Sequence, residues 1–118
     1  MKKFIAKQLD QVRYPSRQQK IQELWDVEGI LKERSNELLK FDLRPIIEFK
    51  KQDYGKWGSF KSKADKMVFD TKTQWILIDI PEMHSYLKNT TKKDVSLSEL
   101  LSKLDWNIIL PQEKEVTV

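Results

Sequence analysis

Apolar residues near the start of the chain recur at helical spacing: Phe4, Ile5, Leu9 and Val12. This spacing predicts a short amphipathic helix, which Pro15 would end. Ser16 followed by Gln19 resembles a capping box, so a second helix is expected to begin there. Gly29 weakens a helical interpretation of what comes next, and residues 24–33 fit either a helix or a strand.

The middle of the chain changes to the pattern of β-strands. Pro45 disfavours helical geometry at Arg44, and residues 46–49 (Ile-Ile-Glu-Phe) are mostly good strand formers. Two further strands are predicted over 67–69 and 75–80. The second of them is apolar on both faces, which is typical of a strand inside a sheet.

Two helices are predicted after these strands. Pro81 suits a first helical turn, and Asp79 is a candidate N-cap for it. Ser96 and Glu99 form a capping box for the second helix, which Asn107 is expected to close. This order of elements predicts an α+β or α/β fold with a mixed sheet of three or more strands, flanked by N- and C-terminal helices.

The length and composition agree with one domain. A chain of 118 residues with 39% hydrophobic residues can bury a core but is short for two domains. We therefore expect a single domain over 1–111 and a frayed C-terminal tail over 112–118. The longest apolar run, 75–80, is too short to cross a bilayer. We expect a cytoplasmic protein with no membrane association.

Two residue counts remove several kinds of chemistry. The chain has no cysteine, which excludes disulfides, thiol nucleophiles and cysteine-based zinc sites. Its one histidine, His84, cannot form a multi-histidine metal site, and we interpret it as a half-exposed residue that either lies at the surface or packs on the core. The net charge of +4 is a mild basic excess whose placement says more than its size.

Lysines and aromatic residues alternate in the segment that follows the predicted strand at 46–49. Lysines neutralise phosphates, and aromatic rings stack on bases or wedge a minor groove. The segment therefore predicts a DNA-binding loop that consists of Lys56, Trp57, Lys61, Lys63 and Lys66. A solvated hairpin whose aromatic residues pack on the core remains an equal alternative.

Glu48 and Lys50 suggest phosphodiester chemistry. Side chains two apart on a strand share a face, so the Glu48 carboxylate could hold Mg²⁺ or Mn²⁺ while Lys50 assists an attacking water. Such a site needs a second carboxylate, and the upstream candidates are Asp26, Glu28 and Asp42. We take Asp26, Asp42 and Glu48 as the candidate metal ligands, with Glu48 and Lys50 as the candidate catalytic residues.

The central third of the chain resembles small phage and mobile-element proteins of the PD-(D/E)xK nuclease superfamily. The elements that carry the resemblance are 47–48 (Ile-Glu), 55–58, 62–65 (Ser-Lys-Ala-Asp) and 75–81. The resemblance implies a restriction-endonuclease-like fold, a divalent-metal site and a DNA substrate. Small nucleases of this kind often act as dimers, so a homodimer is a further expectation.

The chain also departs from that family. In that family, the metal-binding Asp and the acidic-x-Lys pair lie upstream of the strand that is matched here to Glu48. If Lys32 of this chain is matched to the motif lysine, then Ile30 occupies the position of the acidic ligand. Either the ligands are rearranged onto Asp26 or Asp42, or the site is degenerate. Three functions follow: a metal-dependent DNA endonuclease, a non-catalytic DNA-binding module, or a small inhibitor or adaptor of a host protein. In the last case the anchors would be Tyr54, Trp57 and Phe60.

Overall fold

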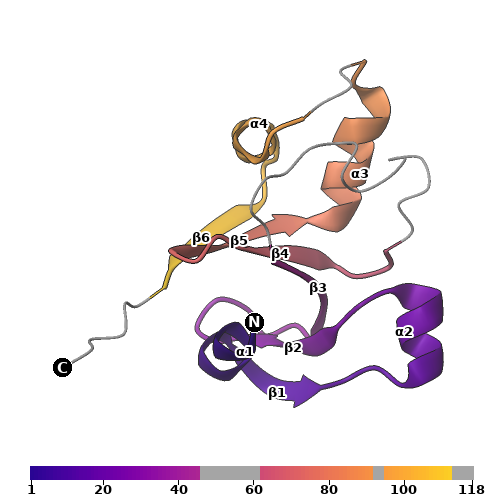
Figure 1. Cartoon of the computed structure of the whole chain (residues 1–118), viewed down its shortest axis with the longest axis vertical. Helices are drawn as coiled ribbons and strands as arrows, with labels where there is room; N and C mark the ends of the chain where they lie inside the picture. Colours follow the sequence, from indigo (N-terminus) through magenta and orange to yellow (C-terminus); the bar gives the residue numbers. More distant parts are fainter. Residues whose placement is uncertain (46–61, 92–94, 113–118) are drawn as a thin grey trace.

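Within the described residues, six strands form one mixed sheet and lie in it in their order along the chain. The computed structural model describes residues 1–45, 62–91 and 95–112. Its elements are α1 (Lys2–Gln8), β1 (Leu9–Arg13), α2 (Arg17–Glu23), β2 (Val27–Leu31), β3 (Leu39–Pro45), β4 (Lys66–Asp70), β5 (Gln74–Asp79), α3 (Ile80–Asn89), α4 (Leu97–Lys103) and β6 (Asn107–Pro111). Figure 1 shows their arrangement.

Only β3 and β4 are parallel neighbours; the other adjacent strands pair antiparallel. The parallel register places Asp42 beside Met67 and Leu43 beside Val68. The described part of the chain therefore has an α+β fold with a six-stranded mixed sheet and four helices. This confirms the expected class, and the sheet is larger than the minimum of three strands that the sequence predicted.

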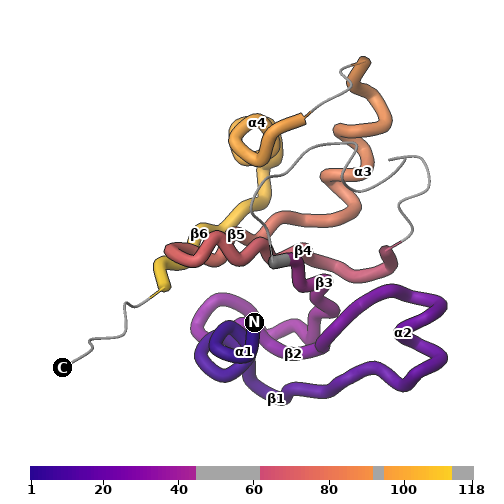
Figure 2. The backbone as a smooth tube through the Cα atoms, viewed as in Figure 1, coloured from indigo at the N-terminus to yellow at the C-terminus, as the bar shows by residue number. Residues whose placement is uncertain are grey.

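Different helices cover the two faces of the sheet. Phe4 of α1 packs on one face, together with Phe41, Val68 and Leu77. Met83 of α3 and the leucines of α4 pack on the other face over β4 and β5. Figure 2 shows α3 and α4 on one side of the sheet, with α1 on the other and α2 at the margin of the molecule. On the α3–α4 face, β2 and β3 carry four charged side chains: Glu28, Lys40, Asp42 and Arg44.

The predicted helix starts are confirmed. The Ser16 hydroxyl accepts the Gln19 N–H at 3.1 Å, and the Gln19 side chain accepts the Ser16 N–H at 3.0 Å. Asp79 caps α3 by accepting the Glu82 N–H at 3.0 Å. Ser96 caps α4 in the same way by accepting the N–H of the third residue of the helix, at 3.1 Å. These bonds satisfy N–H groups that a helix start leaves without intrahelical partners.

The N-terminal prediction was partly wrong. The helix ends at Gln8, and Leu9 begins β1, where it pairs with Leu31 of β2. The undecided segment contains a strand, β2, and its Gly29 lies close to β1. A Cβ at Gly29 would lie 3.2 Å from the Asp10 carbonyl oxygen, so a side chain there would crowd the neighbouring strand. Pairing with β2 therefore overrides the helical spacing at Leu9.

The predicted end of the last helix was also wrong. The helix α4 ends at Lys103, and Asn107 instead begins β6. The Asn107 side-chain amide donates to the carbonyl oxygens of Leu101 at 3.3 Å and Leu104 at 3.0 Å, so it still satisfies the helix end. Gln112 donates to Asp70 at 2.8 Å, whereas residues 113–118 of the predicted tail lie outside the described residues.

Three further sequence predictions concern buried or apolar segments. Trp25 and Trp75 are buried and Trp106 is half-buried, as expected for core or near-core residues. The predicted strand at 46–49 lies outside the described residues. Among the described helices, none has the length and apolar character needed to cross a membrane.

The half-buried His84 gives a prediction on pH dependence. Burial lowers the pKa of its imidazole below the ordinary value of 6.5. Because the unfolded chain then binds the proton more readily, this group lowers the free energy of unfolding as the pH falls below about 6.5. His84→Gln should make that decline shallower in urea denaturation measured from about pH 7 to pH 5. The same pH dependence in both proteins would contradict this effect of burial.

Candidate functional site

A hollow of about 360 Å³ lies where α2 meets the start of β2 and the end of β3. Its wall contains two carboxylates, two cationic side chains and two leucines: Lys20, Leu24, Asp26, Asp42, Leu43 and Arg44. Two candidate metal ligands, Asp26 and Asp42, are therefore part of the same hollow although they are far apart in the sequence.

Asp42 lies in the middle of β3, and its side chain is only 3% exposed. Strand side chains alternate, so Asp42 and Arg44 share the face of Met67, opposite the face of Phe41. The Arg44 guanidinium donates two hydrogen bonds to the Asp42 carboxylate, at 2.8 and 3.1 Å. This bidentate contact compensates the charge that β3 buries.

Asp26 lies just before β2 and is tied to β3 through its backbone and its side chain. Its N–H donates to the Phe41 carbonyl oxygen at 2.8 Å, and its Oδ2 accepts the Leu43 N–H at 2.7 Å. The other carboxylate oxygen is ion-paired with Lys20 of α2. The strand pairing of β2 with β3 thus places Asp26 beside the segment that contains Asp42.

A second group of charged residues adjoins the hollow at the end of α2. The Glu23 carboxylate accepts the Trp25 indole N–H at 2.8 Å and the Lys40 ammonium at 3.1 Å. These hydrogen bonds, that from Trp25 first, hold the pKa of Glu23 below its usual range. The Glu23 carbonyl oxygen accepts the Lys63 N–H at 2.8 Å, so this predicted DNA-binding lysine lies at the end of α2.

The Ser-Lys-Ala-Asp motif has a structural role. The Asp65 carboxylate accepts the backbone N–H of Lys40 at 2.8 Å, and the Asp65 N–H donates to the Lys40 carbonyl oxygen at 2.8 Å. Ala64 is buried in the core that α3 and α4 cover. The motif therefore fixes the approach to β4 against the start of β3, and it presents Lys63 at the surface between them.

Lys66 lies away from the other candidate residues. It pairs with Phe41 in the register of β3 and β4, so it faces the side of the sheet opposite to Asp42. Its ammonium contacts Asp79 at 2.8 Å and lies 3.6 Å from the centroid of the Trp106 ring. With a side chain only 12% exposed, Lys66 is engaged in contacts within the protein.

Five predicted site residues lie outside the described residues: Glu48, Lys50, Lys56, Trp57 and Lys61. Glu28, the third upstream carboxylate that we considered, is buried and accepts the Arg13 guanidinium at 2.8 Å. It does not line the hollow. Over 1–45, 62–91 and 95–112, no three acidic or histidine side chains gather closely enough to hold a metal. Asp26 and Asp42 form a pair only.

The sequence analysis missed Lys20, Leu24 and Arg44. The period-two spacing of Asp42 and Arg44 on a strand was a usable signal, because it places both side chains on one face. No local pattern pointed to Lys20. Its position depends on the turn after α2, where Leu24 takes left-handed geometry with φ 62° and brings the chain back towards β2.

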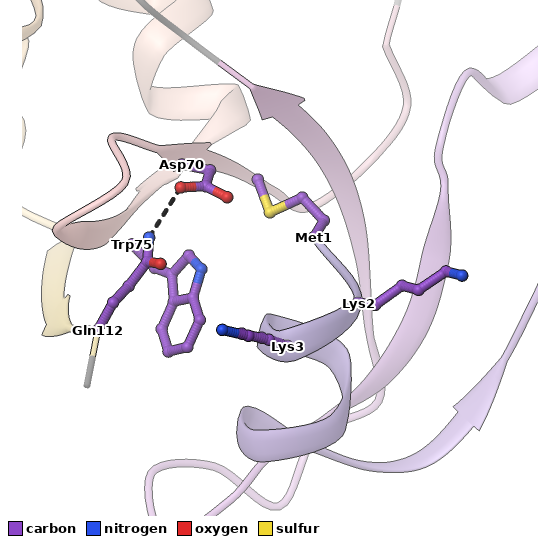
Figure 3. Close-up of a pocket in the computed structure, with 6 residues that line it drawn as sticks. All are labelled: Met1, Lys2, Lys3, Asp70, Trp75 and Gln112. Atoms are coloured by element: carbon purple, nitrogen blue, oxygen red, sulfur yellow. Dashed lines mark hydrogen bonds between the residues drawn. The ribbon is translucent and has the colours of Figure 1, made fainter. Parts of the chain in front are cut away.

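A second hollow, of about 440 Å³, lies on the opposite side of the sheet (Figure 3). Its wall consists of Met1, Lys2, Lys3, Asp70, Trp75 and Gln112. Figure 3 shows Lys3 pointing towards the indole of Trp75 and Lys2 pointing away from it. Asp70 and Gln112 are hydrogen-bonded to each other at 2.8 Å. The hollow has one carboxylate and none of the predicted site residues, so we prefer the first hollow as the candidate site.

No protein-family model matches the chain, and neither a curated protein nor a solved structure shows significant similarity to it. A function for this chain is therefore inferred from the chemistry of the hollow.

Proposed function

We propose that the protein is a metal-dependent DNA endonuclease of a phage or mobile element and that the hollow between α2 and β3 is its active site. The observation that carries this proposal is the convergence of Asp26 and Asp42 on one hollow beside Lys20 and Arg44. Carboxylates for a hard cation next to side chains that bind phosphate are the parts that phosphodiester cleavage requires.

The two carboxylates fit Mg²⁺ or Mn²⁺ in number and kind. Mg²⁺ in proteins commonly uses one or two carboxylates and keeps several waters. Each ionised carboxylate has about four lone-pair sites, and the hydrogen bonds at Asp26 and Asp42 occupy only some of them. A divalent ion held by Asp26 and Asp42 would lower the pKa of a water molecule and so supply the nucleophile. Glu48, six residues after Asp42, is the proposed further ligand, and Lys50 is the proposed residue that assists the water.

Arg44 and Lys20 have a second role in this proposal. In the free protein they neutralise Asp42 and Asp26. With a cation held by Asp26 and Asp42, both side chains would be available to bind the phosphate at the cleavage site. Arg44 suits this role because its planar guanidinium binds two phosphate oxygens at once.

The restriction-endonuclease-like fold belongs to the same proposal. A mixed sheet with helices on both faces agrees with that architecture, and Asp42 lies on β3, which has a strand neighbour on each side. The resemblance in residues 47–81 adds sequence support. Trp25 and Ala64, which are the chain neighbours of Asp26 and Lys63, are buried in the same core.

A plasmid-nicking assay tests the proposed function. The wild-type protein should nick supercoiled DNA with Mg²⁺ or Mn²⁺ and should stop when EDTA is added. Glu48→Gln should remove the activity, because a carboxamide keeps the shape of the side chain but lacks the charge that holds a hard cation. Equal cleavage by both proteins would indicate a contaminating nuclease or a different site.

A second candidate function is supported by the same hollow. Asp26 and Asp42 are each already paired with a basic side chain, Lys20 and Arg44 respectively. Such pairing suits a surface that binds DNA without cutting it. DNA binding without metal-dependent nicking would favour this non-catalytic module. The absence of both binding and nicking would favour the inhibitor or adaptor interpretation.

A further inference from the structure

The helix α2 buries none of its side chains. Four residues at spacings of three and four lie on one side of it and of its C-cap: Arg17, Lys20, Ile21 and Leu24. We call this surface the α2 face. Ile21 is 67% exposed and Leu24 is 40% exposed, while the Lys20 side chain is 51% exposed. Ile21 and Leu24 are three residues apart on the helix, so two exposed aliphatic side chains lie side by side on the α2 face.

The α2 face is continuous with the candidate active site. Lys20 and Leu24 line the hollow, Ile21 lies between them along the helix beside its wall, and Arg17 lies about one turn before Lys20. The face therefore begins at the hollow and leads outwards to the margin of the molecule, where Figure 2 shows α2. Tyr14, which is 62% exposed, lies in the segment just before α2. A polymer chain bound in the hollow would meet the α2 face next.

The chemistry of the face suits a nucleic-acid strand with accessible bases. Arg17 offers positive charge to phosphates, whereas Lys20 is paired with Asp26 in the metal-free protein. Ile21 and Leu24 offer apolar surface to the faces of bases. An intact duplex presents its phosphates outwards but keeps its base faces stacked. Inserting an apolar wedge into it costs unstacking energy, and this cost is smallest where bases are already unpaired.

We infer that the α2 face binds the DNA strand next to the hollow and makes the protein prefer DNA with unpaired bases to intact duplex. The inference rests on the proposed function, because it takes DNA as the substrate. It adds a substrate class, single-stranded or gapped DNA, and a specificity surface that lies outside the metal site.

Binding measured in EDTA tests the inference separately from cleavage. The probes are a fluorescently labelled single strand of about 16 nucleotides and a duplex of the same sequence. The wild-type protein should bind the single strand more tightly. The double variant Arg17→Gln/Ile21→Gln should bind it about tenfold more weakly, with a log–log salt slope that is smaller by about 0.7 for the lost phosphate contact. Glutamine is a good helix former, so α2 should persist.

A matched control makes the same two kinds of substitution in the segment that follows β2, at the end of that strand opposite to α2. Arg34→Gln/Leu38→Gln also removes one exposed arginine and one exposed aliphatic residue, and Leu38 is 50% exposed. This variant should bind the single strand within about twofold of the wild type, because its residues lie away from the α2 face. Circular dichroism should show both variants folded.

The possible outcomes separate the inference from the proposed function. Equal loss in the two variants, or no loss in either, would overturn the role of the α2 face while the proposed nuclease stands. Tighter binding to the duplex than to the single strand would overturn the substrate class. If the wild type binds neither probe and does not nick DNA, the proposed function fails and the inference fails with it. A wild-type protein that self-associates in gel filtration only while Arg17 and Ile21 are intact would mark the face as a protein interface instead.

Discussion

Asp42→Asn should reduce Mg²⁺-dependent nicking by at least about a hundredfold, because it removes a charged ligand from the proposed metal site. Asp42 is more buried than Asp26, the other carboxylate of the hollow, and it lies on β3. Few other side chains can therefore take its place as a metal ligand. The same change weakens the bidentate contact with Arg44 and should cost about 1–3 kcal/mol of the free energy of unfolding. Initial nicking rates are measured at a temperature well below the midpoint of thermal unfolding, so that the loss of stability does not contribute to the loss of activity.

Asp10→Asn is the matched control for this experiment. It makes the same chemical change on β1, where the side chain is 63% exposed and its nearest cation, Lys32, is 3.9 Å away. It should nick DNA at the wild-type rate. A comparable loss of activity in Asp10→Asn would point to net charge as the cause.

Metal binding can also be followed without DNA. A ligand that binds only the folded state raises the unfolding midpoint, so Mn²⁺ should stabilise the wild type and Asp10→Asn. It should not stabilise Asp42→Asn. If Asp42→Asn nicks DNA normally, or if Mn²⁺ stabilises it as much as the wild type, Asp42 is not a metal ligand and serves only to pair with Arg44.

Phe4→Ala should lower the free energy of unfolding by about 3–5 kcal/mol. The Phe4 side chain is fully buried between α1 and the sheet, and its ring centroid lies 6.0 Å from Phe41 and 5.7 Å from Trp75 in edge-to-face contacts. Removing it leaves a cavity and detaches α1 from its face of the sheet. Because small domains have only about 5–15 kcal/mol of stability in total, we expect a large fall in the urea midpoint.

Leu38→Ala provides the comparison for Phe4→Ala. Leu38 is half-exposed between β2 and β3, so its truncation should change stability by no more than about 0.5 kcal/mol. A loss below about 1 kcal/mol in Phe4→Ala would mean that α1 contributes little to the core and that its packing in the structure is not maintained in solution.

Local sequence signals determined the starts of three helices. A capping side chain and the N–H that it binds are three residues apart, so the information for Ser16, Asp79 and Ser96 lies within one helical turn. The strands β4 and β5 were also predictable, because continuous runs of apolar residues fit strands that have neighbours on both sides.

Pairing between distant segments decided the elements that the sequence left open or placed wrongly. Leu9 has helical spacing with Ile5, but its place opposite Leu31 makes it the first residue of a strand. The segment around Gly29 is a strand because β1 and β3 bind it from both sides. Such hydrogen bonds are made with residues that no local window contains, and they outweigh weak local propensities.

The candidate site shows the same division between what the sequence determines and what the tertiary structure determines. The sequence by itself determined which reactive groups are available: carboxylates and lysines, no cysteine and a single histidine. It also predicted Asp26 and Asp42 as candidate metal ligands. Only the tertiary structure decided that these two share a hollow, that Lys20 and Arg44 join them, and that Lys66 faces the other side of the sheet. The physical reason is that strand register assigns each side chain to a face, and register depends on pairing partners that are distant in the chain.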